Sequence, residues 1–277
     1  MSEAIYQNEF DYNSNLEHYE TQTKTSTTYP KCKNSMLKIL HWNANSIKSK
    51  IDNLTTYILE NEPDIILINE IKCNQTQALS LLNLEAYSLE TKVRSENAGR
   101  VAILVNKKIQ YTIENTTKNI EAIIIKIKLI NSYLTICSYY NRPSKKNNKI
   151  SLNTEFLKKL STNNKNLLII GDLNARMKKY GCNNVENKNG KLLRQTLSDS
   201  ELMIEKVDKI PTYYIHHKNG QPSYKEVLDY IICSPKTHSK IEEIDIIDNL
   251  ILGSDHSPIL DTINQKKKQT GINSETT

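Results

Sequence analysis

The run Ile65-Ile66-Leu67-Ile68 constrains the fold more than any other segment, because it sets four apolar residues in succession between Pro63 and Glu70. An uninterrupted apolar run of this length is typical of a strand that is buried on both faces. The chain is therefore expected to contain a sheet that is covered from both sides.

The segments around this run predict further strands and helices. Residues 37–42 are expected to form a strand, followed by a turn at 43–46, and apolar residues at helical spacing predict a helix over 47–61 that Pro63 ends. The other predicted strands are 101–105, 123–129, 134–140, 167–170, 227–233 and 244–247, and the other predicted helices are 154–160 and 192–202.

The predicted strands between residues 101 and 140 follow one another without a helix, which indicates antiparallel pairing beside parallel elements. We therefore predict one mixed α/β domain over residues 37–262. It lies between a flexible polar leader, residues 1–36, and a polar tail, residues 263–277.

Composition narrows the class of protein. With 38% hydrophobic residues, seven glycines and seven prolines, the chain of 277 residues is not collagen-like and should build a core. Its net charge of +6 is compatible with a polyanionic partner. The scarce glycines are expected to mark turns that need positive φ or a close backbone approach. The five widely spaced cysteines form neither a disulfide framework nor a zinc pattern, and most are expected to be small buried residues.

Two features of the sequence bear on location. No stretch approaches the ~18 apolar residues of a membrane helix, and the acidic N-terminus lacks the basic start and apolar region of a signal peptide. We expect an intracellular protein that is not secreted, with lysine groups near residues 145 and 266 as weak nuclear signals.

Carboxylates, amides and a histidine gather after the predicted strands, where open α/β sheets bind ligands. They are Asn43, Asn45, Glu70, Tyr140, Asn141, Asp172 and Asn174, together with Asp229 inside a predicted strand and Asp255-His256 before the last apolar segment. Hard oxygen donors of this kind suit Mg²⁺ or Mn²⁺. Cleavage of a phosphate diester needs charge neutralisation, an activated water and a stabilised leaving oxygen, and these residue types can supply each of them.

Each of these pieces also has a purely structural explanation. Asp-x-Asn after a strand can be a turn or a helix cap, a terminal Glu can be solvated, Asp-His can be a surface pair, and a Tyr at a strand end can be packing. Four other histidines, His41, His216, His217 and His238, are expected to be surface residues or satisfied core residues rather than ligands.

Seven short segments occur in a recognisable order. They are Trp42-Asn43-Ala44-Asn45, Ile68-Asn69-Glu70, Gly99-Arg100-Val101-Ala102-Ile103, Tyr140-Asn141-Arg142-Pro143, Gly171-Asp172-Leu173-Asn174-Ala175, Leu228-Asp229-Tyr230-Ile231 and Gly253-Ser254-Asp255-His256-Ser257-Pro258. In this order they resemble the endonuclease/exonuclease/phosphatase superfamily, and in particular the apurinic/apyrimidinic-type endonuclease domain of non-LTR (LINE, jockey-like) retrotransposons. The resemblance implies a four-layer α/β sandwich of two packed mixed β-sheets flanked by helices, like deoxyribonuclease I, with its site at the strand ends.

The resemblance implies one group of residues around a metal ion and the attacking water. Glu70 would be the principal metal ligand, with Asn43 positioning it, and Asp255 would be a further ligand of the metal or of water. Asp172 would orient or deprotonate the attacking water. Asn174 would hydrogen-bond the phosphoryl oxygens.

A second implied group would handle the phosphate. His256 would bind and polarise the scissile phosphate, and Asp229 would orient its ring. Tyr140 would contact the phosphate near the leaving group. Asn45 and Thr212 are implied to bind substrate, and Thr212 is alternatively an ordinary strand residue.

The departures from the family pattern refine this interpretation. Repair endonucleases that resemble this family carry an aspartate where this chain has Asn45, which shifts the expectation from abasic-site repair toward nicking. Ser46 stands where glycine is usual. Residues 180–193 resemble the stretch that follows Gly-Asp-x-Asn in the retrotransposon branch, and residues 211–213 and 222–223 resemble a DNA-facing hairpin.

The resemblance thus predicts a phosphodiesterase that depends on Mg²⁺, or alternatively Mn²⁺. It would be a DNA-nicking endonuclease of retrotransposon type that leaves a 3′-hydroxyl, with DNA as its partner and no membrane association. The alternatives are an abasic-site repair endonuclease, a phosphatase acting on lipid or inositol phosphates, and a domesticated remnant that holds DNA without turnover.

Overall fold

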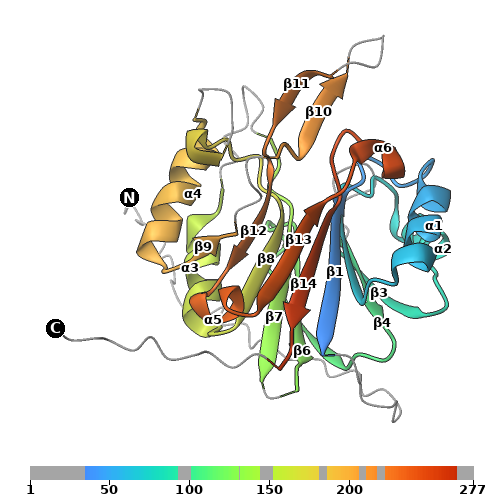
Figure 1. Cartoon of the computed structure of the whole chain (residues 1–277), viewed down its shortest axis with the longest axis horizontal. Coiled ribbons are helices and arrows are strands. Elements are labelled where there is room, and N and C mark those ends of the chain that lie inside the picture. The colour runs from blue at the N-terminus through green and yellow to red at the C-terminus, as the bar shows by residue number, and fades with distance from the viewer. Residues whose placement is uncertain are drawn as a thin grey trace, which may run out of the picture.

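The structure, a computed structural model, describes residues 35–92, 101–130, 132–143, 152–180, 186–205, 210–216 and 222–266 (Figure 1). Most of the predicted leader and tail therefore lies outside the described residues. So do Cys32, Gly99, Arg100, Gly181, Cys182, His217, Gly220 and Gly271.

Two six-stranded sheets form the centre of the fold (Figure 1). The first has the order β13 (Ile241–Ile246), β14 (Ile259–Asn264), β1 (Met36–Asn43), β2 (Ile65–Asn69), β4 (Val101–Asn106), β3 (Tyr87–Lys92). The second has the order β5 (Tyr111–Glu114), β6 (Ala122–Lys128), β7 (Tyr133–Tyr139), β8 (Leu167–Asp172), β12 (Asp229–Cys233), β9 (Met203–Ile204). Strands β1 and β2 pair in parallel, as do β7 and β8, and the other pairs are antiparallel, which confirms the mixed pairing.

Helices and a hairpin complete the fold. The helices are α1 (Ile51–Asn61), α2 (Gln75–Leu81), α3 (Thr154–Asn163), α4 (Lys188–Asp199), α5 (Pro235–His238) and α6 (Asn249–Leu252), with a 3₁₀ turn at Lys178–Tyr180. Strands β10 (Tyr213–His216) and β11 (Pro222–Glu226) pair with each other as a hairpin that projects beyond one end of the sheets (Figure 1). In the part of the chain that the structure covers, no helix is both long and apolar enough to cross a membrane.

Three apolar layers explain the stacking. Residues from both sheets fill the space between them, and β2 contributes Ile65 and Leu67 to this central layer. Its alternate residues Ile66 and Ile68 face α1 and α2 instead. All four side chains are fully buried, so the predicted strand with two covered faces is confirmed. A third layer joins the second sheet to α3 and α4. The result is the predicted four-layer α/β sandwich.

The first helix begins later than its apolar spacing predicts. Helix α1 starts at Ile51 and not at residue 47, although the Ile47 side chain packs in the same layer. The amides of Ser46 and Ile47 donate instead to the carbonyls of Glu70 and Ile71, at 2.8 and 3.2 Å. These bonds tie the loop after β1 to the loop after β2. Ser46 has φ +86°, the left-handed backbone region that explains why glycine is usual there.

Two other predicted elements are displaced. Helix α4 covers Lys188–Asp199 instead of 192–202, because the Asn187 side chain caps its start by accepting from the Gly190 amide. The predicted strand 227–233 is shorter at its start, because β12 begins at Asp229 and residues 227–228 connect it to β11, which ends at Glu226.

The expectation for the glycines is partly confirmed among those that the structure describes. Gly253 has φ +71° and ends α6. At Gly171 a Cβ atom would lie 1.8 Å from the carbonyl oxygen of Tyr139, so this residue meets the close-approach requirement without a positive φ.

Candidate active site

The predicted polar residues meet where strands of the two sheets end on the same side. Asn43 ends β1 and Asp172 ends β8, while Asp229 begins β12, which runs antiparallel to β8. Asp229 and Asp172 are register partners. The hairpin of β10 and β11 projects from this same end of the sheets (Figure 1).

Asn69, the last residue of β2, joins the two sheets beneath the site. Its side-chain oxygen accepts from the backbone amide of Asp172 at 3.0 Å, and its amide donates to the hydroxyl of Ser138 at 3.2 Å. All three residues are buried. The contact fixes the first sheet against the end of β8, and so positions Asp172.

Asn43 connects two of the predicted catalytic carboxylates. Its side-chain amide donates to Glu70 Oε1 at 3.2 Å and to Asp172 Oδ2 at 2.9 Å. The hydroxyl of Tyr140 also hydrogen-bonds Glu70. Burial opposes the ionisation of Glu70, but the adjacent Lys72 and the hydrogen bonds from Tyr140 and Asn43 hold its pKa below the ordinary value.

The carboxylate of Asp172 accepts hydrogen bonds from the turn that follows it in the chain. Asn174 donates to it twice, from the backbone amide to Oδ1 at 2.9 Å and from the side-chain amide to Oδ2 at 3.1 Å. The same side-chain amide donates to the carbonyl of Asn141 at 2.9 Å. Burial raises the pKa of Asp172, and the charge of Asp229 raises it further. A buried carboxylate that holds a proton readily is suited to accept one from water.

Asp229 lies between two histidines. Its Oδ2 is 2.7 Å from Nδ1 of His256, and its Oδ1 is 3.0 Å from Nε2 of His41. Because a carboxylate only accepts, each of these ring nitrogens carries the hydrogen. Although burial acts against both charges, the pairing holds the pKa of Asp229 well below its ordinary range and raises that of His256 to about 9.

Thr212 stabilises the backbone segment that carries Asp229. Its hydroxyl oxygen accepts from the backbone amides of Leu228 and Asp229, both at 3.0 Å, and the residue is fully buried. The next residue, Tyr213, places its ring 4.9 Å from the ring of His256. The predicted contact of Thr212 with substrate stays a prediction, and its observed contacts are to the backbone that carries Asp229.

Asp255 and Asn45 form a second, more exposed group. The side-chain amide of Asn45 lies 3.0 Å from both carboxylate oxygens of Asp255. The ammonium of Lys72 contacts the side-chain oxygen of Asn45 and lies 2.7 Å from Glu70 Oε2. Lys50 donates to the carbonyl of Asn45 at 3.1 Å. Two lysines therefore flank this edge of the site.

The donor set fits a hard divalent cation. Glu70 supplies a partly exposed carboxylate, and Asn43 and Asn45 supply amide oxygens nearby. Lys72 already places a positive charge against Glu70 and Asn45, so these oxygens face a position that accepts a cation. Mg²⁺ takes few protein carboxylates and keeps several waters, so one partly exposed carboxylate such as that of Glu70 can serve as a ligand for such an ion.

The structure thus brings together the ten predicted residues and adds three to which the sequence assigned no role in the site. These are Asn69, His41 and Lys72. Asn69 and Lys72 flank Glu70 in sequence, which is a local signal, and His41 faces inward on β1 beside Trp42. The expectation that His41 is a satisfied core histidine is met on Nε2 alone, since Nδ1 has no hydrogen-bond partner among the described residues.

Comparisons with known proteins bear on the family and the fold. A model of the Endonuclease/Exonuclease/phosphatase family matches residues 40–256. The chain is 23% identical over 236 residues to the "Probable RNA-directed DNA polymerase from transposon X-element" of Drosophila melanogaster. That match covers 82% of this chain but 24% of the relative, so the chain spans about a quarter of the relative's length.

Solved structures share the fold. The endonuclease domain of TRAS1, a telomere-specific non-LTR retrotransposon, superposes with a TM-score of 0.69 at 20% identity, covering 83% of this chain and 100% of that domain. The AP endonuclease LMAP from Leishmania major gives 0.64 at 15% identity, covering 83% and 88%. The 3′ phosphatase NExo from Neisseria, bound to product DNA hairpin, gives 0.61 at 16% identity, covering 81% and 98%.

The family model covers most of the chain, from Leu40 within β1 to His256, and so includes every residue of the site. The chain belongs to the Endonuclease/Exonuclease/phosphatase family.

Proposed function

We propose that this chain is a Mg²⁺-dependent phosphodiesterase that nicks DNA and leaves a 3′-hydroxyl, with Mn²⁺ as an alternative ion. The observation that carries the proposal is the pairing of His256 with Asp229 beside buried Asp172. With Nδ1 of His256 committed to Asp229, Nε2 is the nitrogen that can face a phosphate. Asp172, whose pKa is raised, is the group that can take a proton from water.

The remaining residues have supporting roles in this proposal. Glu70 is the principal metal ligand, positioned by Asn43, and Asp255 is a further ligand of the metal or its water. Bound there, the ion would neutralise charge that develops on the phosphate and the leaving oxygen. Tyr140 hydrogen-bonds Glu70 and is proposed to contact the phosphate near the leaving group.

Asn174 and Asn45 are proposed to contact the substrate. The side-chain amide of Asn174 already donates to Asp172 and Asn141, so donation to a phosphoryl oxygen requires that it exchange one of these partners. Asn45 faces Asp255 at 3.0 Å, where an aspartate would set two carboxylates against each other. The neutral amide supports nicking of intact DNA over the aspartate-containing site of repair endonucleases.

The named relatives support the same preference. One is the endonuclease domain of a non-LTR retrotransposon, and another is a probable polymerase from a transposon. The shared fold also includes AP endonucleases, so abasic-site repair is the competing activity to test.

The proposal is tested with three substrates. Supercoiled plasmid, an intact duplex and a duplex with one abasic site are incubated with the protein in Mg²⁺, in Mn²⁺ and in EDTA. We expect nicked plasmid with either ion and none in EDTA, and a nick that a DNA polymerase can extend. Cleavage confined to the abasic duplex would establish repair instead, and salt-dependent binding without cleavage would establish a DNA-holding remnant.

A further inference from the structure

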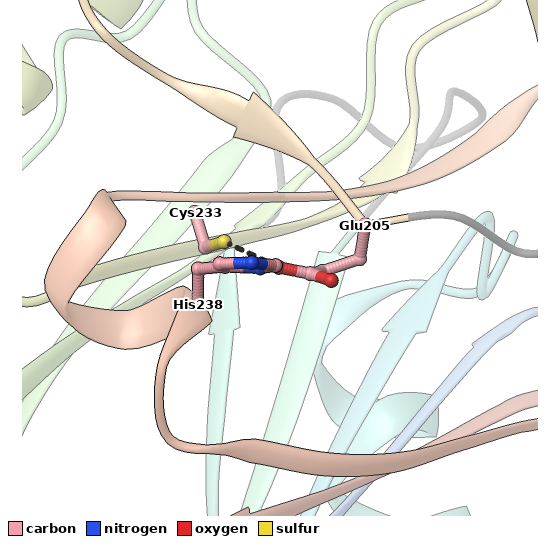
Figure 2. Close-up of side chains that lie close together, drawn as sticks. All are labelled: Glu205, Cys233 and His238. Carbon is pink, nitrogen blue, oxygen red and sulfur yellow. Dashed lines mark hydrogen bonds and ion pairs between the residues drawn. The ribbon is translucent and has the colours of Figure 1, made fainter. Parts of the chain in front are cut away.

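A second cluster of ionisable side chains lies at the far end of β12 from the candidate active site. This strand begins at Asp229 and ends at Cys233, four residues and roughly 13 Å away. Glu205 follows β9, whose neighbour is β12, and donates its backbone amide to the carbonyl of Ile231 at 2.9 Å. His238 is the last residue of α5. Figure 2 shows the side chains of Glu205, Cys233 and His238 pointing toward one another from these three elements.

The three side chains present one oxygen, one sulfur and one nitrogen to a common point. Their ligand atoms all lie within 4.8 Å of one another. Sγ of Cys233 is 3.0 Å from Oε1 of Glu205, and Nδ1 of His238 contacts the same oxygen (Figure 2). Cys233 is fully buried and Glu205 is nearly so, whereas the side chain of His238 is 49% exposed. The cluster therefore has a closed interior and an open side through which an ion can enter.

A fourth group makes the cluster unusual. Asp261 of β14 is fully buried on the face that carries Ile259 and Ile263 into the layer between the sheets, the layer that also holds Cys233. Neither carboxylate oxygen of Asp261 has a hydrogen-bond partner of good geometry among the described residues. Burial and the charge of Glu205 raise its pKa to about 8, and the neighbouring Thr262 amide offsets only part of this.

Hydrogen bonding alone accounts for only part of this arrangement. The thiol of Cys233 can donate to Glu205, and a protonated His238 can pair with the same carboxylate. Such a network leaves Asp261 unsatisfied in an apolar layer, and a buried unpaired carboxylate is costly. A bound divalent cation would balance the charges of Glu205 and of a Cys233 thiolate, and it would give Asp261 a favourable electrostatic partner.

We propose that Glu205, Cys233 and His238 form a structural site for Zn²⁺, with Asp261 as a nearby buried carboxylate that the ion would stabilise. Sulfur, imidazole nitrogen and carboxylate oxygen together are a donor set that zinc accepts and that Mg²⁺ does not favour. Binding would replace the S–H bond of Cys233 with a Zn–S bond and release the proton to solvent. The ion would fasten β9, β12 and α5 along one edge of the second sheet.

The site differs from the candidate nuclease centre in its ligands and its place. The described nuclease residues include no thiol, whereas Cys233 gives this site a spectroscopic signature. Cobalt bound to a thiolate shows a charge-transfer band in the near ultraviolet, so the two sites can be distinguished in one protein.

The test uses the full chain, from which metal is first removed with a chelator. The protein is then titrated with Zn²⁺ or Co²⁺, and the metal content, the thiolate-to-cobalt band and the melting temperature are recorded. We expect one tightly bound ion per chain, the thiolate band, and a rise in melting temperature. His238→Ala, a change at a half-exposed position, and Cys233→Ala should each abolish the tight site. Asp261→Asn should weaken zinc binding by about 10–100-fold, as the loss of an outer partner does.

Cys137→Ala is the matched control, because Cys137 is also a fully buried free cysteine on a strand of the second sheet. It should bind zinc like the unchanged chain. Absence of the thiolate band in the unchanged chain, or equal zinc affinity in His238→Ala and Cys137→Ala, would overturn the proposal. Circular dichroism establishes that each variant is folded before its titration is interpreted.

Discussion

Nδ1 of His256 lies 2.7 Å from Oδ2 of Asp229, and both side chains are buried. This contact joins the loop after α6 to the first residue of β12, so two segments far apart in the chain form one unit. The carboxylate fixes the orientation of the His256 ring, with Nδ1 toward Asp229 and Nε2 outward, and it stabilises the protonated form of the ring.

The first prediction concerns this orientation. Asp229→Asn keeps the shape of the side chain but removes the negative charge that holds the His256 ring protonated, so the ring loses the charged N–H that would bind a phosphate. We expect plasmid nicking to fall by about 10²–10⁴-fold, the usual size of a lost acid–base contribution. Nicking rates for Asp229→Asn measured under saturating DNA would test this. A loss below threefold would show that Asp229 does not orient His256.

The second prediction concerns stability and pH in EDTA. The pKa of His256 in the folded chain, about 9, lies above its ordinary value of about 6.5, so its stabilising effect is complete below about pH 6.5 and is lost as the pH rises through about 9. The free energy of unfolding should fall by on the order of 3 kcal/mol between about pH 6 and pH 10. Asp229→Asn should show a much flatter dependence in urea titrations, and parallel curves for the two proteins would contradict the pairing.

The third prediction separates hydrogen bonding from packing at His41. His41→Gln can still donate to Asp229 Oδ1, whereas His41→Leu cannot and leaves a buried carboxylate oxygen unsatisfied. We expect His41→Leu to lower the free energy of unfolding by about 1–3 kcal/mol, and His41→Gln to lower it by clearly less. Equal destabilisation by both substitutions, measured by urea titration, would show that packing and not the hydrogen bond matters here.

The fourth prediction concerns the strand that carries Asp172. In Gly171→Ala the new methyl group would overlap the carbonyl oxygen of Tyr139, which lies 1.8 Å from its position. Because that atom belongs to the backbone of neighbouring β7, β8 must shift. We expect a loss of more than about 3 kcal/mol in stability, at the upper end for overpacking. Cys137→Ala alters the same pair of strands without such a clash and should cost less, and similar losses would contradict the argument.

Much of the fold follows from local patterns in the sequence. The apolar run 65–68 became β2 with its two covered faces, and polar residues at strand ends became the site because strands of both sheets end together. Apolar spacing gave the wrong helix start where contacts with residues distant in the sequence determine the backbone conformation. Ile47 has the helical spacing of α1 yet lies outside it, since its amide is bonded to the carbonyl of Ile71.

The candidate site could likewise be predicted only in part from the sequence. Residue types and order indicated Glu70, Asp172 and His256, whereas the partner of Asp229 on β1 could not be predicted. His41 shows no motif, and its role depends on how the first sheet, which contains β1, packs against the second sheet, which contains β12. The cluster at Cys233 was missed for the same reason, because Glu205, Cys233 and His238 have no metal-binding spacing and meet only through the pairing of β9 with β12.

The most direct test of the proposed chemistry is the rate at which supercoiled plasmid is nicked in Mg²⁺ by the unchanged chain, by Asp172→Ala and by Asp199→Ala. Asp199 is a surface aspartate that pairs with Lys158 on neighbouring α3, so its loss controls for the removal of a carboxylate. We predict that Asp199→Ala nicks like the unchanged chain and that Asp172→Ala loses about 10²–10⁴-fold of the rate while remaining folded. Equal nicking by all three proteins would contradict the assignment of this site as the nuclease centre.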